Sequence, residues 1–251
     1  MRFKYNKEIE FFLKKYLFPK KFLYKKRLER SIKNQDENEI KLVKNFIKPG
    51  TDSIDVGVYR GVYSYEMSKY SNIVHAFEPN PIIFDDLKKN LIKLKKNINL
   101  YNFALSNKSS KINLKVPIRN KNFKKENYEE YYEMGKATIH NENNIQDFEN
   151  VEIFSKKLDE INFKNQISFI KIDVEGHEIE VINGAIQTIN RFKPNLLVEI
   201  EKKYTQKNVS ESLKYITSLG YNSFVYQNDL LKNTLEISDL DSYNNYIFIP
   251  S

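Results

Sequence analysis

The chain has 251 residues, no cysteine, three histidines and a formal net charge of +8. The lack of cysteine excludes disulfides and thiolate metal sites, and so few histidines argue against a zinc site. With 40% hydrophobic residues, 17 Phe and 17 Tyr, the chain can form a full hydrophobic core. No segment approaches the roughly 18 apolar residues of a membrane span. The N-terminus has no apolar core of a secretory signal, so we expect a cytoplasmic protein.

The basic excess lies at the N-terminus. Residues 1–30 hold 11 of the 41 Lys or Arg residues and three of the 33 Asp or Glu residues. The rest of the chain therefore holds equal numbers of basic and acidic residues. Three amphipathic helical segments are expected before residue 48: residues up to Pro19, 20–31 and 36–47. This basic helical extension (1–48) either packs on the sheet edge or in a dimer contact, or presents a basic surface to an anionic membrane or polymer. The neutral remainder gives no clear nucleic-acid site.

A strand, a glycine turn and a helix follow the extension. Residues 53–56 are short and apolar, and Asp55, Gly57 and Gly61 form the pattern Asp-x-Gly-x-x-x-Gly before a helix over 61–70. Glycine lets the backbone pass close to a ligand, at a helix N-terminus that presents free N–H groups. The pattern indicates a nucleoside-binding turn.

The second strand is expected over 72–77 and ends at Glu78. An acidic residue at this position accepts hydrogen bonds from both hydroxyls of a ribose. Asn80 and Pro81 then begin a helix as its N-cap and first residue. Helix capping is enough to explain the presence of these two residues. A third strand is expected over 98–104.

An insert interrupts the alternation of strands and helices. Residues 111–117 and 151–156 alternate like strands, and the polar, tyrosine-rich segment 118–150 lies between them. It is too long for an ordinary connection and is expected to be a lid, a substrate loop or a flexible excursion. Its tyrosines are suited to stack on sugar rings.

The last part of the chain returns to strands and helices. Strands are expected over 167–174, 195–200, 222–226 and 246–249, and helices over 178–190 and from a cap at Asn208 to Gly220. Strands that alternate with helices predict a doubly wound parallel sheet. We assign residues 49–251 to one domain of this α/β class.

Several nucleotide-binding motifs are absent. None of the seven glycines is spaced Gly-x-Gly, so the dinucleotide fingerprint is missing, and so are the P-loop and the Gly-x-Ser-x-Gly elbow. The remaining evidence for a nucleoside site is the glycine turn and the acidic residue after the second strand.

With these pieces in place, the sequence resembles the FkbM family of S-adenosylmethionine (SAM)-dependent methyltransferases. The matching segments occur in the family's order and are IDVGVYRGVYS (54–64), HAFEPNP (75–81), NFALSN (102–107), KKLDEI (156–161), FIKIDVEGHEIEVINGA (169–185) and PNLLVEI (194–200). The extension lies outside the resemblance. One departure is Tyr59, which occupies a position of the turn where the family usually has Asn.

The resemblance implies a class I methyltransferase fold, Rossmann-like, with an antiparallel last strand. It also implies a methyltransferase (transferase) that uses SAM as cofactor and carries out O-methylation, often of a sugar or natural product. The implied cofactor-binding set comprises Asp55, Gly57 and Gly61 in the turn, Glu78 for the ribose, Asn102, Phe103 and Ala104 near the adenine, and Asp173 near the reacting centre. Tyr59 and Asn80, in the same two loops, complete this set.

A sugar hydroxyl loses its proton with difficulty, so a base near it would help. The candidates are His177, Glu175 and Asp173, and transfer without a single base is the alternative. No metal site is predicted, although Asp173 with another carboxylate could hold Mg²⁺. Lys171, on the same strand face as Asp173, is expected to pair with Asp55 and Glu199 rather than to act in catalysis.

Three functions are compatible with these residues. The favoured one is an O-methyltransferase that acts on a hydroxyl of a glycan, sugar or related metabolite. The second is a protein or nucleic-acid methyltransferase that docks through the basic N-terminus. The third is a module that binds SAM without transferring the methyl group. The sequence leaves an oligomeric state open.

Overall fold

The computed structural model describes residues 19–34, 37–122, 128–139, 147–202 and 209–251. The expected helix before Pro19 and the expected cap at Asn208 lie outside these residues. Over the described part, no helix is both long and apolar enough to cross a membrane.

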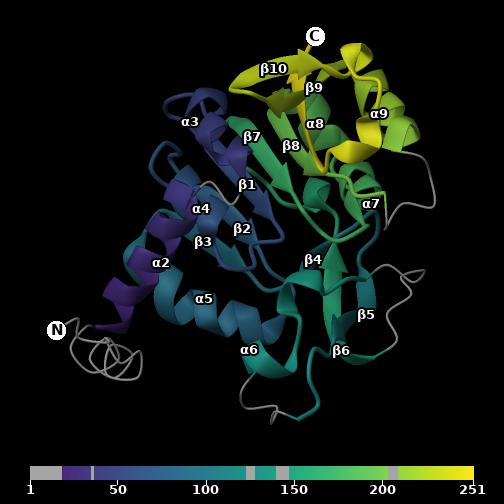
Figure 1. Cartoon of the computed structure of the whole chain (residues 1–251). Coiled ribbons are helices and arrows are strands. Elements are labelled where there is room, and N and C mark those ends of the chain that lie inside the picture. Colours follow the sequence, from purple (N-terminus) through teal and green to yellow (C-terminus); the bar gives the residue numbers. More distant parts are fainter. Residues whose placement is uncertain (1–18, 35–36, 123–127, 140–146, 203–208) are drawn as a thin grey trace, which may run out of the picture.

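An eight-stranded sheet forms the centre of the molecule (Figure 1). Its strands, in spatial order, are β10 (Leu230–Asn233), β9 (Tyr221–Gln227), β11 (Asn245–Pro250), β8 (Asn195–Glu199), β7 (Ile167–Ile172), β1 (Asp52–Val56), β2 (Val74–Phe77) and β3 (Ile98–Tyr101). The five strands from β8 to β3 pair in parallel, whereas β11 runs antiparallel to β8 and β9. The prediction of a mostly parallel sheet with an antiparallel last strand is confirmed.

The edge strand β10 was not predicted. It pairs antiparallel with β9 through a two-residue turn at Asn228 and Asp229. Both residues have positive φ, 53° and 60°, as a type I′ hairpin turn requires. The sequence signal for this turn is usually Asn-Gly or Asp-Gly, so Asn-Asp gives little warning of a hairpin.

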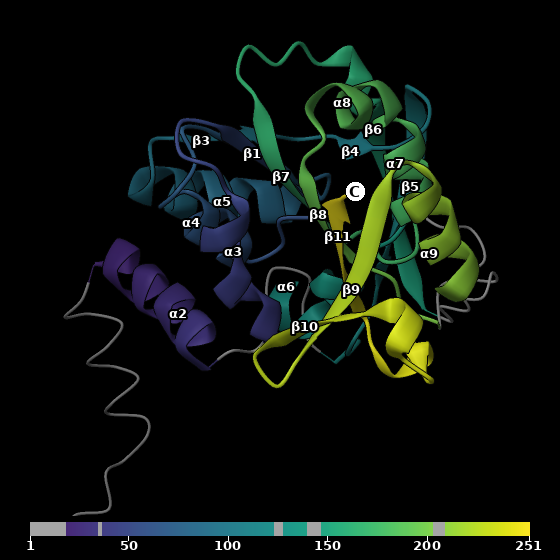
Figure 2. The ribbon, with the colours of Figure 1, turned by 90° about the horizontal axis from the view of Figure 1, so that it is seen from above.

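Helices cover both faces of the sheet (Figure 2). One group comprises α2 (Lys20–Asn34), α3 (Val43–Phe46), α4 (Val62–Met67) and α5 (Pro81–Leu94), and the other comprises α7 (Glu178–Asn183), α8 (Ile186–Phe192) and α9 (Val209–Ser218). Along β7, Phe169 joins the hydrophobic core under the first group, and Ile170 and Ile172 join the core under the second. This alternation follows from the two-residue period of a strand.

The helix predicted over 178–190 is wrong as a single element. It is divided at Gly184, where a Cβ atom would lie 2.0 Å from the carbonyl oxygen of Ser106. The second half, α8, has its own cap, because the carboxylate of Asp159 accepts hydrogen bonds from the backbone N–H groups of Gln187 and Thr188. Close backbone packing and a distant cap together end one helix and begin another.

The described part of the N-terminal extension packs on the domain. In α2, Tyr24 and Leu28 are buried in the core that α4 and α5 share. The hydroxyl of Tyr24 also donates a hydrogen bond to the carbonyl oxygen of Arg60 at 2.9 Å. The third expected segment forms a 3₁₀ turn (Asn38–Leu42) followed by α3. A contact of the extension with a membrane or polyanion stays a prediction.

A small second sheet lies beside the carboxyl ends of the central strands (Figure 1). It consists of β4 (Ala104–Leu105), β6 (Phe148–Lys156) and β5 (Ser110–Pro117), with β5 and β6 antiparallel. The two strands expected on either side of the insert are therefore confirmed. The insert contains α6 (Tyr128–Tyr131) and a 3₁₀ turn (Met134–Lys136). Thr138 forms a bridge with Lys115 of β5, and Tyr132 forms one with Ile118, the residue after β5.

Candidate functional site

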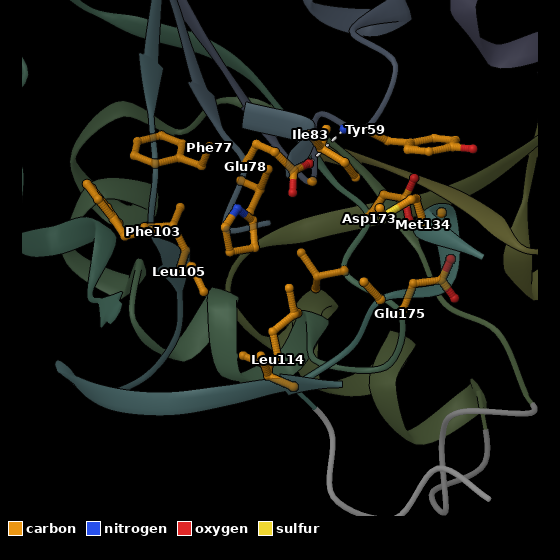
Figure 3. A pocket seen from close by; sticks show the side chains of 18 residues that line it. Tyr59, Phe77, Glu78, Ile83, Phe103, Leu105, Leu114, Met134, Asp173 and Glu175 are labelled. Carbon is orange, nitrogen blue, oxygen red and sulfur yellow. Dashed lines mark hydrogen bonds between the residues drawn. The ribbon is translucent and has the colours of Figure 1, made fainter. Parts of the chain in front are cut away.

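A cavity opens at the carboxyl ends of β1, β2 and β7, beneath the insert. Its volume is about 680 Å³, including the part open to solvent. Figure 3 shows Glu78 between an apolar wall, which includes Phe77 and Phe103, and a polar side with Asp173 and Glu175. The loops that follow parallel strands meet at this edge, as ligand sites of doubly wound sheets do.

Glu78 is a buried carboxylate in the cavity wall. Its Oε2 accepts a hydrogen bond from the backbone N–H of Tyr59 at 2.9 Å (Figure 3). Its Oε1 accepts one from the backbone N–H of Asn80, also at 2.9 Å. Burial raises the pKa of Glu78 to about 7, and the nearby carboxylates of Asp55 and Asp173 add to this effect. A carboxylate has about four acceptor positions, so two remain for hydroxyl groups of a ligand.

Gly57 allows the ends of β1 and β7 to approach each other. Its φ is +84°, and a Cβ atom there would lie 1.8 Å from the carbonyl oxygen of Asp173. Every other residue type would push the Asp173 loop away from the turn. The glycine thus brings the two predicted acids, Glu78 and Asp173, to one cavity.

Tyr59 adopts a backbone conformation that costs free energy for its residue type. Its φ is +46°, in the left-handed region that Asn and Gly tolerate best. The conformation directs its N–H to Glu78, and its ring lies about 3.1 Å from where a Cβ atom of Gly135 would stand. The usual Asn of the family suits this backbone, whereas Tyr adds a ring that contacts the insert.

Asp173 belongs to a network of buried charges. The ammonium group of Lys171 lies 2.5 Å from Oδ2 of Asp173, and Lys171 is almost fully buried. Burial opposes its charge, but Asp173, with Glu37, Asp55 and Glu199, raises the pKa of Lys171. The direct partner is therefore Asp173, and the expected partners Asp55 and Glu199 contribute at longer range.

Glu199 lies at the end of β8, beside Asp173. Its burial and the adjacent Asp173 carboxylate raise the pKa of Glu199 far above its usual range. Protonated Glu199 can donate a hydrogen bond to Asp173. Lys171 and Glu199 together fix the Asp173 carboxylate at the edge of the cavity.

Glu178 holds the loop after β7, a role that the sequence pattern did not indicate. Its buried carboxylate reaches back from the first turn of α7 and accepts hydrogen bonds from the N–H groups of Gly176 (3.0 Å) and Val174 (3.3 Å). The same loop holds Glu175 at a φ of +55°, and the hydroxyl of Thr138 donates to its carbonyl oxygen at 2.7 Å. The sequence shows an acidic residue at the start of a helix, where it interacts favourably with the helix dipole. This feature does not indicate which loop the acidic side chain holds.

We expect the free energy of unfolding to fall as pH rises through neutrality. Burial raises the pKa values of Glu78 and Glu178 from 4.5 to about 7. Between these values the folded chain binds protons that the unfolded chain has lost, so the two groups stabilise the fold at low pH and lose this effect as pH passes 7. Urea unfolding at pH 5.5 and 8 should show the decrease. Glu178→Gln, which keeps the acceptor, should reduce it, and an unchanged decrease would contradict the assignment.

The structure brings together seven of the residues predicted for the site. The cavity lining contains Gly57, Tyr59, Glu78, Phe103, Ala104, Asp173 and Glu175. Their roles in binding or catalysis stay predictions. The lining also contains residues that the sequence did not single out, among them Ile83, Leu105, Leu114 and Met134.

Three other predicted residues support this lining from behind. Asp55 is fully buried and accepts a 2.5 Å hydrogen bond from the hydroxyl of Ser64. Asn80 caps α5 by accepting from the N–H of Ile82, as the sequence indicated. The amide of Asn102 donates to the carbonyl oxygen of Glu78 at 2.9 Å. They shape the two loops and do not line the cavity.

The remaining two predicted residues lie further from the cavity. Gly61 begins α4 and packs beneath Leu87 and Leu91 of α5. His177 Nε2 shares a 2.9 Å hydrogen bond with the hydroxyl of Ser106, and Nδ1 lies 3.7 Å from Glu180. Among the described residues, no group of three or more His, Asp or Glu side chains is arranged to hold a metal ion.

The sheet order and the cavity at its carboxyl edge define a class I methyltransferase fold, in which the antiparallel β11 lies between β8 and β9. Residues 55–223 match the methyltransferase FkbM domain. The chain therefore belongs to the FkbM methyltransferase family, as the sequence motifs indicated.

Known proteins resemble the chain over different lengths. It is 30% identical over 162 residues to the hexuronic acid methyltransferase AglP of Haloferax volcanii, a match that covers 63% of this chain and 61% of that protein. The structure of methyltransferase FkbM from Methylobacillus flagellatus superposes with a TM-score of 0.47 and 13% identity, over 84% of this chain and 50% of that one. The structure of a TehB-like SAM-dependent methyltransferase from Corynebacterium glutamicum superposes with a TM-score of 0.46 and 11% identity. This match covers 92% of this chain and 98% of that one.

Proposed function

We propose that the chain is a SAM-dependent O-methyltransferase whose acceptor is a hydroxyl group of a sugar, with acidic sugars as the favoured class. The observation that carries the cofactor is the buried Glu78 carboxylate, held by two backbone N–H groups in a cavity at the carboxyl ends of β1 and β2. The choice of a sugar rests on the similarity to a protein named hexuronic acid methyltransferase.

The residues of the cavity suit SAM. Glu78 has two acceptor positions left for the ribose hydroxyls. The apolar wall of Phe103, Leu105 and Leu114 would hold the adenine, and Asp173 would hold the ammonium group of the methionine part. When bound, SAM supplies a methyl group already activated by its sulfonium, so the protein has to align the acceptor and take its proton.

Glu175 is our choice for the base that takes this proton. It lines the cavity, and its loop is fixed by Glu178 and by Thr138 of the insert. Asp173, which also lines the cavity, is already engaged in an ion pair with the ammonium group of Lys171. His177 is hydrogen-bonded to Ser106 outside the lining, so we rank it below Glu175.

Titration with S-adenosylhomocysteine tests the cofactor assignment. The two ribose hydroxyls need the ionised form of Glu78, whose pKa burial raises to about 7. We expect the affinity to fall as pH drops below 7, by up to about tenfold per pH unit, with proton release on binding. Calorimetry in two buffers that differ in ionisation enthalpy measures both effects. Glu78→Gln should bind weakly and without this pH dependence. The same pH dependence in the variant would refute the role of Glu78, and no binding at millimolar ligand would refute SAM.

A further inference from the structure

A second cavity, of about 480 Å³ including the part open to solvent, adjoins the first. The two share Tyr59, Ile83 and Met134 in their walls, so a ligand in one lies next to a ligand in the other. Four separate segments line it: helix α2, the glycine turn, helix α5 and the insert. The roles proposed above for the first cavity use none of the charged residues of the second.

Positive charge predominates in this second cavity. Among the described residues, its lining includes Arg27 of α2, Arg60 of the turn and Arg119 after β5, against one carboxylate, that of Asp86. Arginine presents a fork of N–H donors that matches the two oxygens of a carboxylate or phosphate. Three arginines from three segments of the chain therefore point to an anionic ligand.

Aromatic rings place two of these arginines. The guanidinium of Arg60 lies 5.1 Å from the centre of the Tyr59 ring, and that of Arg27 lies 4.9 Å from the centre of the Tyr24 ring. Such contacts hold a guanidinium over a ring face. Because the Tyr24 hydroxyl also donates to the carbonyl oxygen of Arg60, α2 and the glycine turn are tied together at this cavity.

The insert contributes rings as well as charge. Tyr128 and Tyr132 line the cavity, and the Tyr132 hydroxyl is fixed by a 2.7 Å hydrogen bond to Glu149 of β6. Flat rings pack against the apolar faces of sugar rings, and a carboxylate such as that of Asp86 accepts hydrogen bonds from sugar hydroxyls. The cavity thus combines the groups that a charged sugar requires.

We propose that the second cavity is the acceptor subsite and that its arginines bind an oxyanion carried by the acceptor sugar. This inference rests on the proposed function and adds that an acidic group is required for recognition. The oxyanion is a sugar carboxylate or a sugar phosphate, which share the chemistry that an arginine fork recognises. The acceptor lies across the insert, α5 and the turn, so that one of its hydroxyls enters the first cavity beside Glu175.

The test compares glucose-derived acceptors with and without an anionic group. Methyl β-D-glucuronide, methyl β-D-glucoside and glucose 6-phosphate are titrated into the protein saturated with S-adenosylhomocysteine, and each is then assayed for turnover with SAM. We expect the glucuronide or the phosphate to bind at least about tenfold more tightly than the glucoside, as one charged hydrogen-bonded pair provides. The carboxylate and phosphate arms identify which oxyanion is preferred.

Variants then locate the effect. Arg119→Met and Arg60→Met should each remove about tenfold or more of the preference for the anionic sugar and leave glucoside binding unchanged. Arg119→Lys keeps the charge, so it should recover part of the preference. Arg191→Met is the matched control, since Arg191 lies on α8 over the other face of the sheet, and it should change nothing.

Two results would overturn the inference. One is equal affinity of the wild-type protein for all three sugars, and the other is an anionic preference that survives Arg119→Met combined with Arg60→Met. Binding of S-adenosylhomocysteine is measured in the same samples and reports on the cofactor site alone. If the wild-type protein did not bind S-adenosylhomocysteine, the proposed function itself would fail.

Discussion

Glu175→Gln is expected to lower kcat by roughly 10²–10⁴-fold, the usual contribution of a positioned general base. Gln has nearly the shape of Glu and cannot take a proton. Glu175 reaches the cavity from a loop that Glu178 and Thr138 hold by hydrogen bonds to its backbone, so this substitution leaves the support of the loop in place. Affinity for S-adenosylhomocysteine should change little, which calorimetry checks on the same protein.

His177→Gln provides the comparison. The His177 ring is bonded to Ser106 and lies outside the cavity lining, and Gln can keep a hydrogen bond to the Ser106 hydroxyl. We expect kcat to stay within about threefold of the wild type, far less than the loss that removal of a base causes. If His177→Gln removed turnover while Glu175→Gln retained it, the assignment of the base would be reversed.

Gly57→Ala is expected to destabilise the chain by about 3 kcal/mol and to abolish cofactor binding at micromolar ligand. The added Cβ atom would stand 1.8 Å from the carbonyl oxygen of Asp173. Either β1 and β7 separate at their ends or the turn moves away from Glu78. Both changes disturb the N–H group of Tyr59 that holds the Glu78 carboxylate. Urea unfolding and calorimetry measure the two effects.

Gly50→Ala is the matched control for this substitution. Gly50 has a similar φ of +77°, and nothing lies within 4 Å of where its Cβ atom would be. Both variants carry the backbone cost of alanine at positive φ, about 1 kcal/mol. Only Gly57→Ala adds the clash. Equal losses of stability and full cofactor binding in both variants would show that the contact with Asp173 is unimportant.

The sequence located the first cavity well because parallel strands end at a common edge. Once β1, β2 and β7 were recognised from their apolar residues, Gly57, Glu78 and Asp173 had to lie near one another. The cap at Asn80 was predicted for a similar reason, since a cap depends on neighbouring residues alone. Local signals and a simple topology were enough.

Local sequence patterns could not predict the contacts between segments that are distant in the chain. Glu178 holds its loop by reaching back along the chain, and Gly135 of the insert receives the ring of Tyr59. The second cavity needs α2, which lies outside the family resemblance, to place Arg27 beside Arg60 and Arg119. No periodicity or motif indicates that these three arginines meet. Only the packing of the extension and the insert on the domain reveals it.

The most direct test of the proposed activity is mass spectrometry of a reaction that contains the purified chain, SAM and methyl β-D-glucuronide. We expect S-adenosylhomocysteine and a sugar methylated on a ring hydroxyl, in equal amounts, with the product greatly reduced for Glu175→Gln. A methyl ester on the carboxylate would contradict O-methylation of a hydroxyl. Cofactor binding without any methylated product from this sugar, the glucoside or glucose 6-phosphate would contradict a sugar methyltransferase.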